Sequence, residues 1–464
     1  MNLAQHTQTT RRRRSLPALL ITGLLALGTS PALANAGSID GVAGVAGVAD
    51  ENREANAKNP LPSQTHVFIT GGTVFTGDGD LLEQATIEVK GDQIVAVHTA
   101  PVRVPEGART VDATGKFITP GLIGVDTALG LLEIELEAST RDTARNDDTD
   151  IRAGFQPARA INADSSLIRI QATEGVTTAA VAPSGGLLSG QVAWIDLLQG
   201  DHTGIVREAS VAVDGSLGQQ VAGNRAEALA ALERAFMDAQ LLRKKSAAYE
   251  RNQLRELSAH PTDLEALYPV LDGAVPLTLR VQRASDILAA LALAERLGIR
   301  LTVLGGAEAW KVRDALARAG VTVVVQPTSN LPQSFESLGA RLENAALLHE
   351  AGVRVGIAVF GDSHNVRNAR QEAGIAAAYG LPRDAALRAI THNLAVAYGK
   401  EDSDGALKAG RLANLVVWSG DPLELSSWPE AVFIRGREIP PVSRQTLLRD
   451  RYLQKIRQGI GAAD

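Results

Sequence analysis

The stretch Lys116-Phe-Ile-Thr-Pro-Gly-Leu-Ile-Gly-Val-Asp-Thr-Ala-Leu-Gly130 carries the strongest fold signal in the chain. A short apolar run leads into Pro120-Gly121, and a second apolar run ends at Asp126. Because Pro and Gly interrupt regular structure, the pattern predicts a turn followed by a buried strand. An acidic side chain then stands at the carboxyl end of that strand.

The composition is that of a globular protein with a sizeable core. The chain has 464 residues, of which 45% are hydrophobic and 21% are charged, and this length predicts one or two domains. It contains no cysteine. That absence excludes disulfides, thiolate metal sites and cysteine nucleophiles.

The N-terminus predicts an export signal over residues 1–34. Arg11 to Arg14 form a basic region, Leu16 to Gly28 an apolar run, and Ala32-Leu-Ala34 a small-residue cleavage site. The apolar run is shorter than the roughly 20 residues that span a bilayer. We therefore expect a periplasmic or extracellular protein cleaved near Ala34, exported by the general or the twin-arginine route. An uncleaved anchor and a mitochondrial presequence are the alternatives.

The charge of the mature chain bears on its partners. Loss of the four arginines takes the formal net charge from −6 to −10. An acidic chain is poorly suited to nucleic acid or to anionic lipid, so we expect neither partner, and no membrane contact after cleavage. We expect a small molecule instead.

Both ends of the remaining chain are predicted to be β-rich. Residues 35–64 are predicted to form a flexible leader, because they contain a Gly-Val-Ala repeat followed by a segment rich in charged residues. Alternation over residues 65–117 predicts an antiparallel unit, with Val67 to Phe75 as a strand, a Gly-Gly turn and a second strand. Residues 400–440 predict two further strands.

The middle of the chain, residues 118–398, alternates strands with helices. This alternation predicts parallel βα units, and their number and length suit a (β/α)₈ TIM-like barrel. The stretch near 225–258 is too long for an ordinary barrel helix and predicts a helical insertion. Residues 441–464 form a predicted helical tail.

Several motifs resemble the amidohydrolase superfamily, most closely its imidazolonepropionase-like branch. The opening stretch resembles the family's first barrel strand, and Gly361-Asp-Ser363 resembles its strand-eight motif. Gly405 to Trp418 and Thr391 to Gly399 resemble two later motifs. The resemblance implies a barrel beside a composite β-sandwich formed by the two chain ends, and barrels that often pair.

The resemblance also implies one or two divalent metals, held largely by histidines, that activate water for hydrolysis. In this sequence Asp126 and Ala128 stand where the family has its His-x-His pair, and Arg280 or Gln282 where a later His is expected. Asp126, Asp362 and His364 are the remaining candidate ligands for a single Zn²⁺ or Mn²⁺ ion. Alternatively the site holds no metal, and Arg280 neutralises the two carboxylates.

These residues define the predicted site. Asp362 and Asp126 are the candidate catalytic groups, and the candidate substrate contacts are Arg280, Gln282, His364 and Glu135. Ser184 and Ser189, in a Gly-rich loop, would need a nearby base to act as nucleophiles.

The resemblance implies a hydrolase of non-peptide or cyclic carbon–nitrogen bonds. Two alternatives remain open from the sequence. One is an inactive, metal-free binding protein that forms a homodimer or partners an active paralogue. The other is a metal-free hydrolase with Asp126 or Asp362 as general base.

Overall fold

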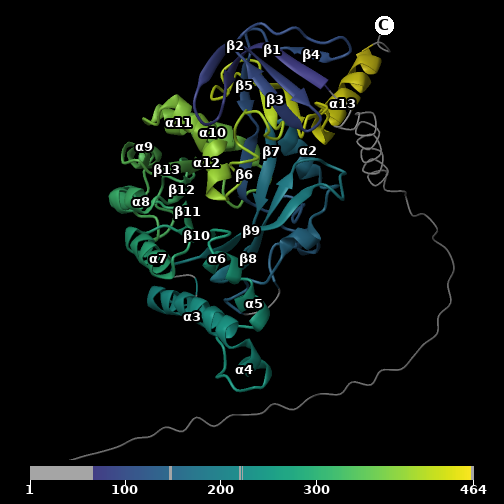
Figure 1. Cartoon of the computed structure of the whole chain (residues 1–464). Coiled ribbons are helices and arrows are strands. Elements are labelled where there is room, and N and C mark those ends of the chain that lie inside the picture. The colour runs from purple at the N-terminus through teal and green to yellow at the C-terminus, as the bar shows by residue number, and fades with distance from the viewer. Residues whose placement is uncertain (1–65, 146–148, 219–220, 222, 461–464) are drawn as a thin grey trace, which may run out of the picture. The chain divides into compact units, whose positions relative to one another are not determined.

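The computed structural model describes residues 66–145, 149–218, 221 and 223–460. The predicted signal and leader lie outside the described residues, as does the end of the tail. The described chain contains two sheets of eight strands each, together with the helices that accompany them (Figure 1). No described helix is both long and apolar enough to cross a bilayer.

The first sheet joins strands from the two ends of the chain. Its order is β16-β15-β14-β5-β1-β2-β3, with β4 beside β1. The strands are β1 (His66–Phe75), β2 (Leu81–Lys90), β3 (Gln93–His98), β4 (Arg109–Asp112), β5 (Phe117–Pro120), β14 (Leu415–Trp418), β15 (Pro429–Ile434) and β16 (Arg437–Glu438). The antiparallel pairing of β5 with β14 connects the ends, as expected. The strands form one hydrogen-bonded sheet, where a two-sheet sandwich was predicted.

The predicted Gly-Gly turn near residue 71 is wrong. β1 runs unbroken across this position, and its register against β2 shifts on both sides of Gly72. Gly71 has a φ of +78°, which glycine adopts without steric cost. The two glycines therefore form an irregularity within a strand, as single glycines in strands often do.

The second sheet is predominantly parallel. Its order is β13-β12-β11-β10-β9-β8-β7-β6. The strands are β6 (Leu122–Thr127), β7 (Val176–Val181), β8 (Leu188–Asp196), β9 (Val206–Ser216), β10 (Leu277–Val281), β11 (Leu301–Gly305), β12 (Thr322–Val325) and β13 (Arg354–Ile357). The α/β class is as predicted. However, β8 runs antiparallel to both of its neighbours, so the sheet is not built from eight identical strand–helix units.

The two outer strands of this sheet approach each other at one end. Among the described ladders none pairs β6 with β13. The loop after β13 makes the connection instead, because Ser363 Oγ accepts the Ala128 N–H at 2.9 Å and contacts Thr127 Oγ1 at 3.2 Å. The curled sheet is thereby tied together at the carboxyl ends of its parallel strands.

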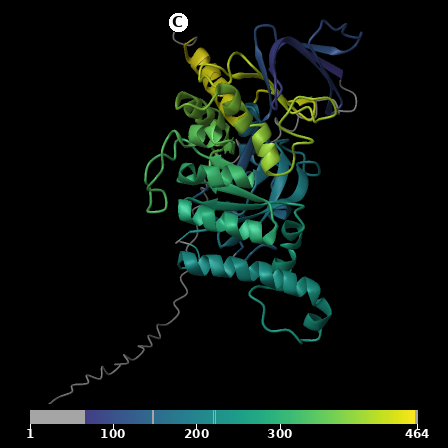
Figure 2. The same ribbon diagram turned by 60° about the vertical axis from the view of Figure 1, so that its left-hand side comes forward.

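Helices follow most parallel strands and lie along one side of the sheet (Figure 1). The principal ones are α2 (Ser166–Thr173), α7 (Ala284–Leu297), α8 (Arg313–Ala319), α9 (Asn344–Glu350), α10 (Ala369–Ala378), α11 (Arg383–Ala389) and α12 (His392–Ala397). In the predicted insertion, α3 (Arg225–Lys244) leads into the short α4 (Ser246–Glu250), as the teal segment of Figure 2 shows. α5 (Pro261–Glu265) and α6 (Tyr268–Leu271) follow, and α13 (Arg444–Ile460) ends the chain.

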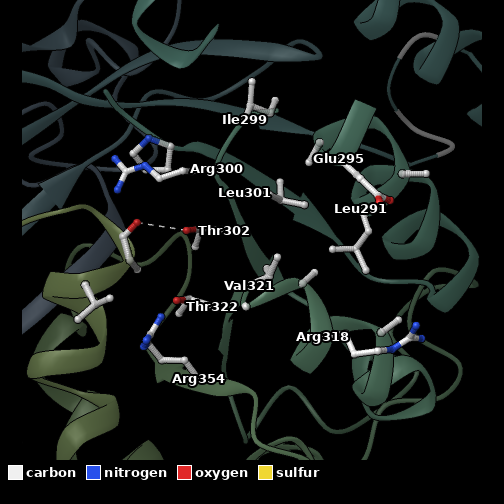
Figure 3. A pocket seen from close by; sticks show the side chains of 18 of the residues that line it. Leu291, Glu295, Ile299, Arg300, Leu301, Thr302, Arg318, Val321, Thr322 and Arg354 are labelled. Atoms are coloured by element: carbon white, nitrogen blue, oxygen red, sulfur yellow. Dashed lines mark hydrogen bonds between the residues drawn. The ribbon is translucent and has the colours of Figure 1, made fainter. Parts of the chain in front are cut away.

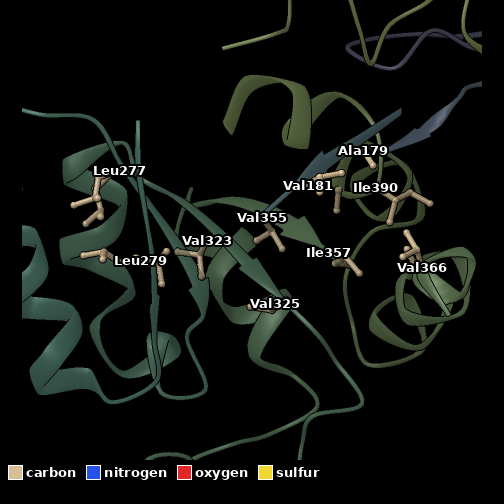
Figure 4. Close-up of a cluster of buried hydrophobic side chains, with 14 of the residues drawn as sticks. Ala179, Val181, Leu277, Leu279, Val323, Val325, Val355, Ile357, Val366 and Ile390 are labelled. Atoms are coloured by element: carbon tan, nitrogen blue, oxygen red, sulfur yellow. The ribbon is translucent and has the colours of Figure 1, made fainter. Parts of the chain in front are cut away.

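Strand alternation separates two cores. One face of β10 directs Leu277, Leu279 and Val281 into the large core under the helices, where Val323 and Val355 of neighbouring strands also pack (Figure 4). A second buried cluster lies inside the curled sheet and contains Trp194 of β8, with its ring 5.8 Å from that of Tyr398. The alternate residues of β10, Thr278 and Arg280, face this second cluster.

Candidate functional site

A cavity of about 610 Å³ opens at the carboxyl ends of the parallel strands. Its lining includes Asp126 from β6, Asp214 from β9, Arg280 from β10 and Ser189 from the start of β8. In barrels of parallel strands this end carries the reactive groups, because several strand ends converge there. We therefore take this cavity as the candidate functional site.

Asp126 sits at a bulge in β6. The register of β6 against β7 skips between Val125 and Thr127, and Asp126 has a φ of +56°. A left-handed conformation is tolerated by Asp better than by most residues, and such positions often accompany function. The bulge places the carboxylate at the cavity, where Asp126 is only 5% exposed.

Arg280 is the partner of Asp126. Its guanidinium donates to Asp126 Oδ1, and its charge lies over the ring of Phe360. The other carboxylate oxygen, Asp126 Oδ2, is buried and has no hydrogen-bond partner among the described residues. Burial raises the pKa of Asp126, and the charge of Arg280 opposes that rise. Asp126 therefore has one oxygen bonded to Arg280 and one buried oxygen whose hydrogen-bonding capacity is unused among the described residues.

A second carboxyl group, Asp214, lies in the same cavity. It is 2% exposed and accepts hydrogen bonds from Thr278 Oγ1, at 2.7 Å, and from Ser189. Burial raises the pKa of Asp214 to about 7, the Asp126 charge adds to the rise, and Arg280 opposes it. Asp214 is therefore close to half-protonated near neutral pH, the condition in which a carboxyl group can both accept and donate a proton.

The structure brings together only part of the predicted site. Asp126 and Arg280 form an ion pair, and Glu135 lies at the rim of their cavity. Gln282 lines a different, small cavity and holds the Ala307 N–H through its side-chain oxygen. It therefore does not share a pocket with Arg280.

Asp362 and His364 form hydrogen bonds that stabilise the loop after β13. The carboxylate of Asp362 accepts the His364 N–H at 3.0 Å and the Asn365 side-chain amide at 2.7 Å. The carbonyl of His364 accepts from Gln171 and Arg367. The alternative in which Arg280 neutralises both carboxylates therefore holds for Asp126 and fails for Asp362.

The residues present do not fit the metal that the resemblance implies. No group of three or more His, Asp or Glu side chains in the described part of the chain is placed to hold a metal ion. Asp126 is engaged by a cation, and both oxygens of Asp362 are used within its own loop. Asp126, Asp362 and His364 thus do not converge on a ligand set.

Sequence reasoning overlooked Asp214. In the segment Val211-Ala-Val-Asp214 an apolar run ends at an aspartate. The same pattern made Asp126 a candidate. Ser189 gains significance for the same reason, since the base that it would need as a nucleophile lies beside it.

Two other cavities differ from this one. A hollow of about 1300 Å³ shares Arg141, Thr143 and Ser184 with the site, so a ligand bound there has room to extend. A cavity of about 710 Å³ lies at the opposite, amino ends of β11, β12 and β13, where Leu301 and Val321 form an apolar wall between Arg300 and Arg354 (Figure 3).

Residues 222–439 match the family model described as Amidohydrolase family. An amidohydrolase from Thermotoga maritima is 25% identical, with a TM-score of 0.72, and the similarity covers 81% of this chain and 99% of that one. No curated protein matches the chain.

More distant structures support the amidohydrolase fold. A zinc-bound adenosine deaminase from Xanthomonas campestris is 18% identical, with a TM-score of 0.51 over 85% of this chain and 99% of that chain. A putative prolidase from Bifidobacterium longum is 16% identical, with a TM-score of 0.50 over 85% and 100%. The matched domain supplies Arg280, whereas Asp126, Ser189 and Asp214 precede it.

Proposed function

We propose that this protein hydrolyses a carbon–nitrogen bond of a small molecule bound in the 610 Å³ cavity, without a catalytic metal. The observation that carries the proposal is Asp214, a buried carboxyl at the cavity with a pKa of about 7. Perturbed carboxyls in clefts are the usual general acids and bases of hydrolases. In the proposed reaction Asp214, and not Asp362, transfers the proton.

The step that follows uses groups lining one cavity. Asp214 takes a proton from a water molecule as the water oxygen bonds to the substrate carbonyl carbon. The carbon–nitrogen bond then breaks, and Asp214 returns the proton to the leaving nitrogen. Arg280 stabilises the negative charge that develops on the carbonyl oxygen, and Asp126 holds the guanidinium in position.

The amidohydrolase neighbours support the reaction class by analogy. The Thermotoga maritima structure is described as an amidohydrolase, and the family model covers the second half of the barrel. Fold alone is a weak argument for activity. The cavity and its buried carboxyl support the reaction, and the substrate class is a small amide, linear or cyclic.

The test compares two buried aspartates whose pKa values are both about 7. Asp214 lines the cavity, and Asp196 does not. Against a panel of linear and cyclic amides, we expect hydrolysis whose kcat/KM rises with pH through about 7. Asp214→Asn should reduce it by at least the 10²-fold typical of a general base, and Asp196→Asn should leave it within twofold.

Hydrolysis that survives in Asp214→Asn would remove this residue from the mechanism. Absence of turnover on the whole panel would favour a second candidate function, ligand binding without catalysis. The Asp126–Arg280 ion pair favours that alternative, because it stands where the resemblance expects metal ligands. In that case Asp214→Asn would still bind ligand, measured by calorimetry.

We also propose export and self-association. The basic, apolar and small-residue segments of residues 1–34 support export, and cell fractionation with N-terminal sequencing tests it. A mature chain beginning at Asn35 is the expected product. Sedimentation equilibrium distinguishes a monomer from a homodimer, and co-expression with a paralogue tests the paired form.

A further inference from the structure

The C-terminal helix α13 (Arg444–Ile460) presents an apolar stripe to solvent. Leu448, Tyr452 and Ile456, spaced four residues apart, are 37%, 59% and 56% exposed, and Leu453 beside them is 42% exposed. Residues three or four apart lie on the same face of a helix. Every residue from 448 to 458 is exposed, so none of the other described elements buries this face.

Cations border the stripe. Residues 445–458 contain Arg449, Arg451, Lys455 and Arg457 against a single acid, Asp450. Arg449 pairs with that acid at 2.8 Å, and within the described chain none of the other three cations has a carboxylate oxygen within 4 Å. A helix with an apolar stripe flanked by Arg and Lys is the pattern of a segment that lies in a lipid–water interface.

We propose that α13 binds the surface of a membrane that contains anionic lipid. The rest of the chain is acidic, since the whole has a formal net charge of −6, yet α13 does not dock on it. Pairing of α13 with the same helix of a second copy would bring like charges together. An anionic bilayer instead offers acyl chains to the stripe and phosphates to Arg451, Lys455 and Arg457.

This inference revises the expectation drawn from net charge. Net charge averages over the chain, whereas an interface contacts only one helix, and charges beyond about 10 Å are screened at physiological salt. Tyr452 supports the assignment, because its ring has the amphipathic character found at membrane interfaces. The helix would lie on the bilayer and not cross it.

The test uses the chain from Asn35, because the apolar run of residues 1–34 would itself bind lipid. Flotation is measured with vesicles of phosphatidylcholine alone and with vesicles that also contain about one third phosphatidylglycerol. We expect binding to the anionic vesicles, weakened by salt. One cation near such a surface contributes about 1 kcal/mol, or about fivefold in affinity.

Three variants complete the design. Arg451→Gln/Lys455→Gln should lower affinity by about 25-fold, which is two cations at about fivefold each. Leu448→Gln/Ile456→Gln should abolish flotation. Lys244→Gln/Lys245→Gln, at the exposed end of α3, removes the same charge elsewhere and should bind like the wild type.

Each remaining outcome overturns the proposal. No flotation of the wild type with anionic vesicles would leave α13 to a protein partner. Equal flotation of the wild type and both helix variants would assign lipid binding to another segment. Thermal unfolding at the wild-type temperature confirms that the variants are folded.

Discussion

Replacing Arg280 by methionine tests the ion pair on which the site depends. Methionine keeps the apolar stem of the side chain and removes the charge, so Asp126 is left 5% exposed with neither oxygen hydrogen-bonded. Removing one partner of a buried pair costs about 3–5 kcal/mol. The Arg280 side chain is 35% exposed to the cavity, so we expect the lower end of that range, about 3 kcal/mol.

The reverse substitution should cost less. Asp126→Asn leaves Arg280 beside Asp214, and Asn tolerates the left-handed backbone of this position. We expect a loss of about 1 kcal/mol, comparable to one hydrogen bond. Arg296→Met is the matched control, because its pair with Glu233 is 2.8 Å long and exposed, and such pairs contribute less than about 1 kcal/mol.

The cost of Arg280→Met should depend on pH. Without the arginine the pKa of Asp126 rises further above its unfolded value, since burial is no longer opposed. Stability from such a group is lost as pH rises through the folded pKa, so the loss should be larger at pH 8 than at pH 5. Urea unfolding at both pH values measures it. Equal losses for Arg280→Met and Asp126→Asn, or a loss independent of pH, would refute the reasoning.

Two further substitutions test the barrel and its boundary with the first sheet. Burial raises the pKa of Asp196 to about 7, so this residue should remove roughly 2–3 kcal/mol of stability between pH 5 and pH 8. Asp196→Asn should abolish that part of the slope in urea unfolding, whereas Asn at the exposed Asp402 should not. Gly121→Ala places its Cβ 2.0 Å from Thr177 Oγ1 and should destabilise by at least about 2 kcal/mol. Ala at Gly79, whose nearest neighbour would be 3.9 Å away, should stay within about 0.5 kcal/mol in thermal melts.

Most of the fold could be predicted from local sequence patterns. Strands and helices alternate between Leu277 and Ala378 as predicted, because each element has a clear hydrophobic period. β8 was not predicted. The apolar residues of β8 follow the Gly-rich loop with no helix in between. Nothing in these residues specifies that β8 pairs antiparallel with β7 and β9.

Only part of the candidate site could be predicted from the sequence. Asp126 and Arg280 stand at motif positions, so their partnership could be anticipated. Asp362 could not be excluded in advance, because its two hydrogen bonds close a loop whose conformation depends on distant contacts through Ser363. Asp214 stands outside any motif, and its raised pKa is a consequence of burial and of the neighbouring Asp126 charge.

The Asp126–Arg280 ion pair also favours Asp214 as the carboxyl group that transfers the proton. One oxygen of Asp126 is bonded to the Arg280 guanidinium, which opposes the rise in pKa that burial causes at Asp126. Asp214 has only hydroxyl partners, so burial raises its pKa to about 7 and the Asp126 charge adds to the rise. The cation that neutralises one acid thus leaves the other able to titrate in the range where a hydrolase needs it.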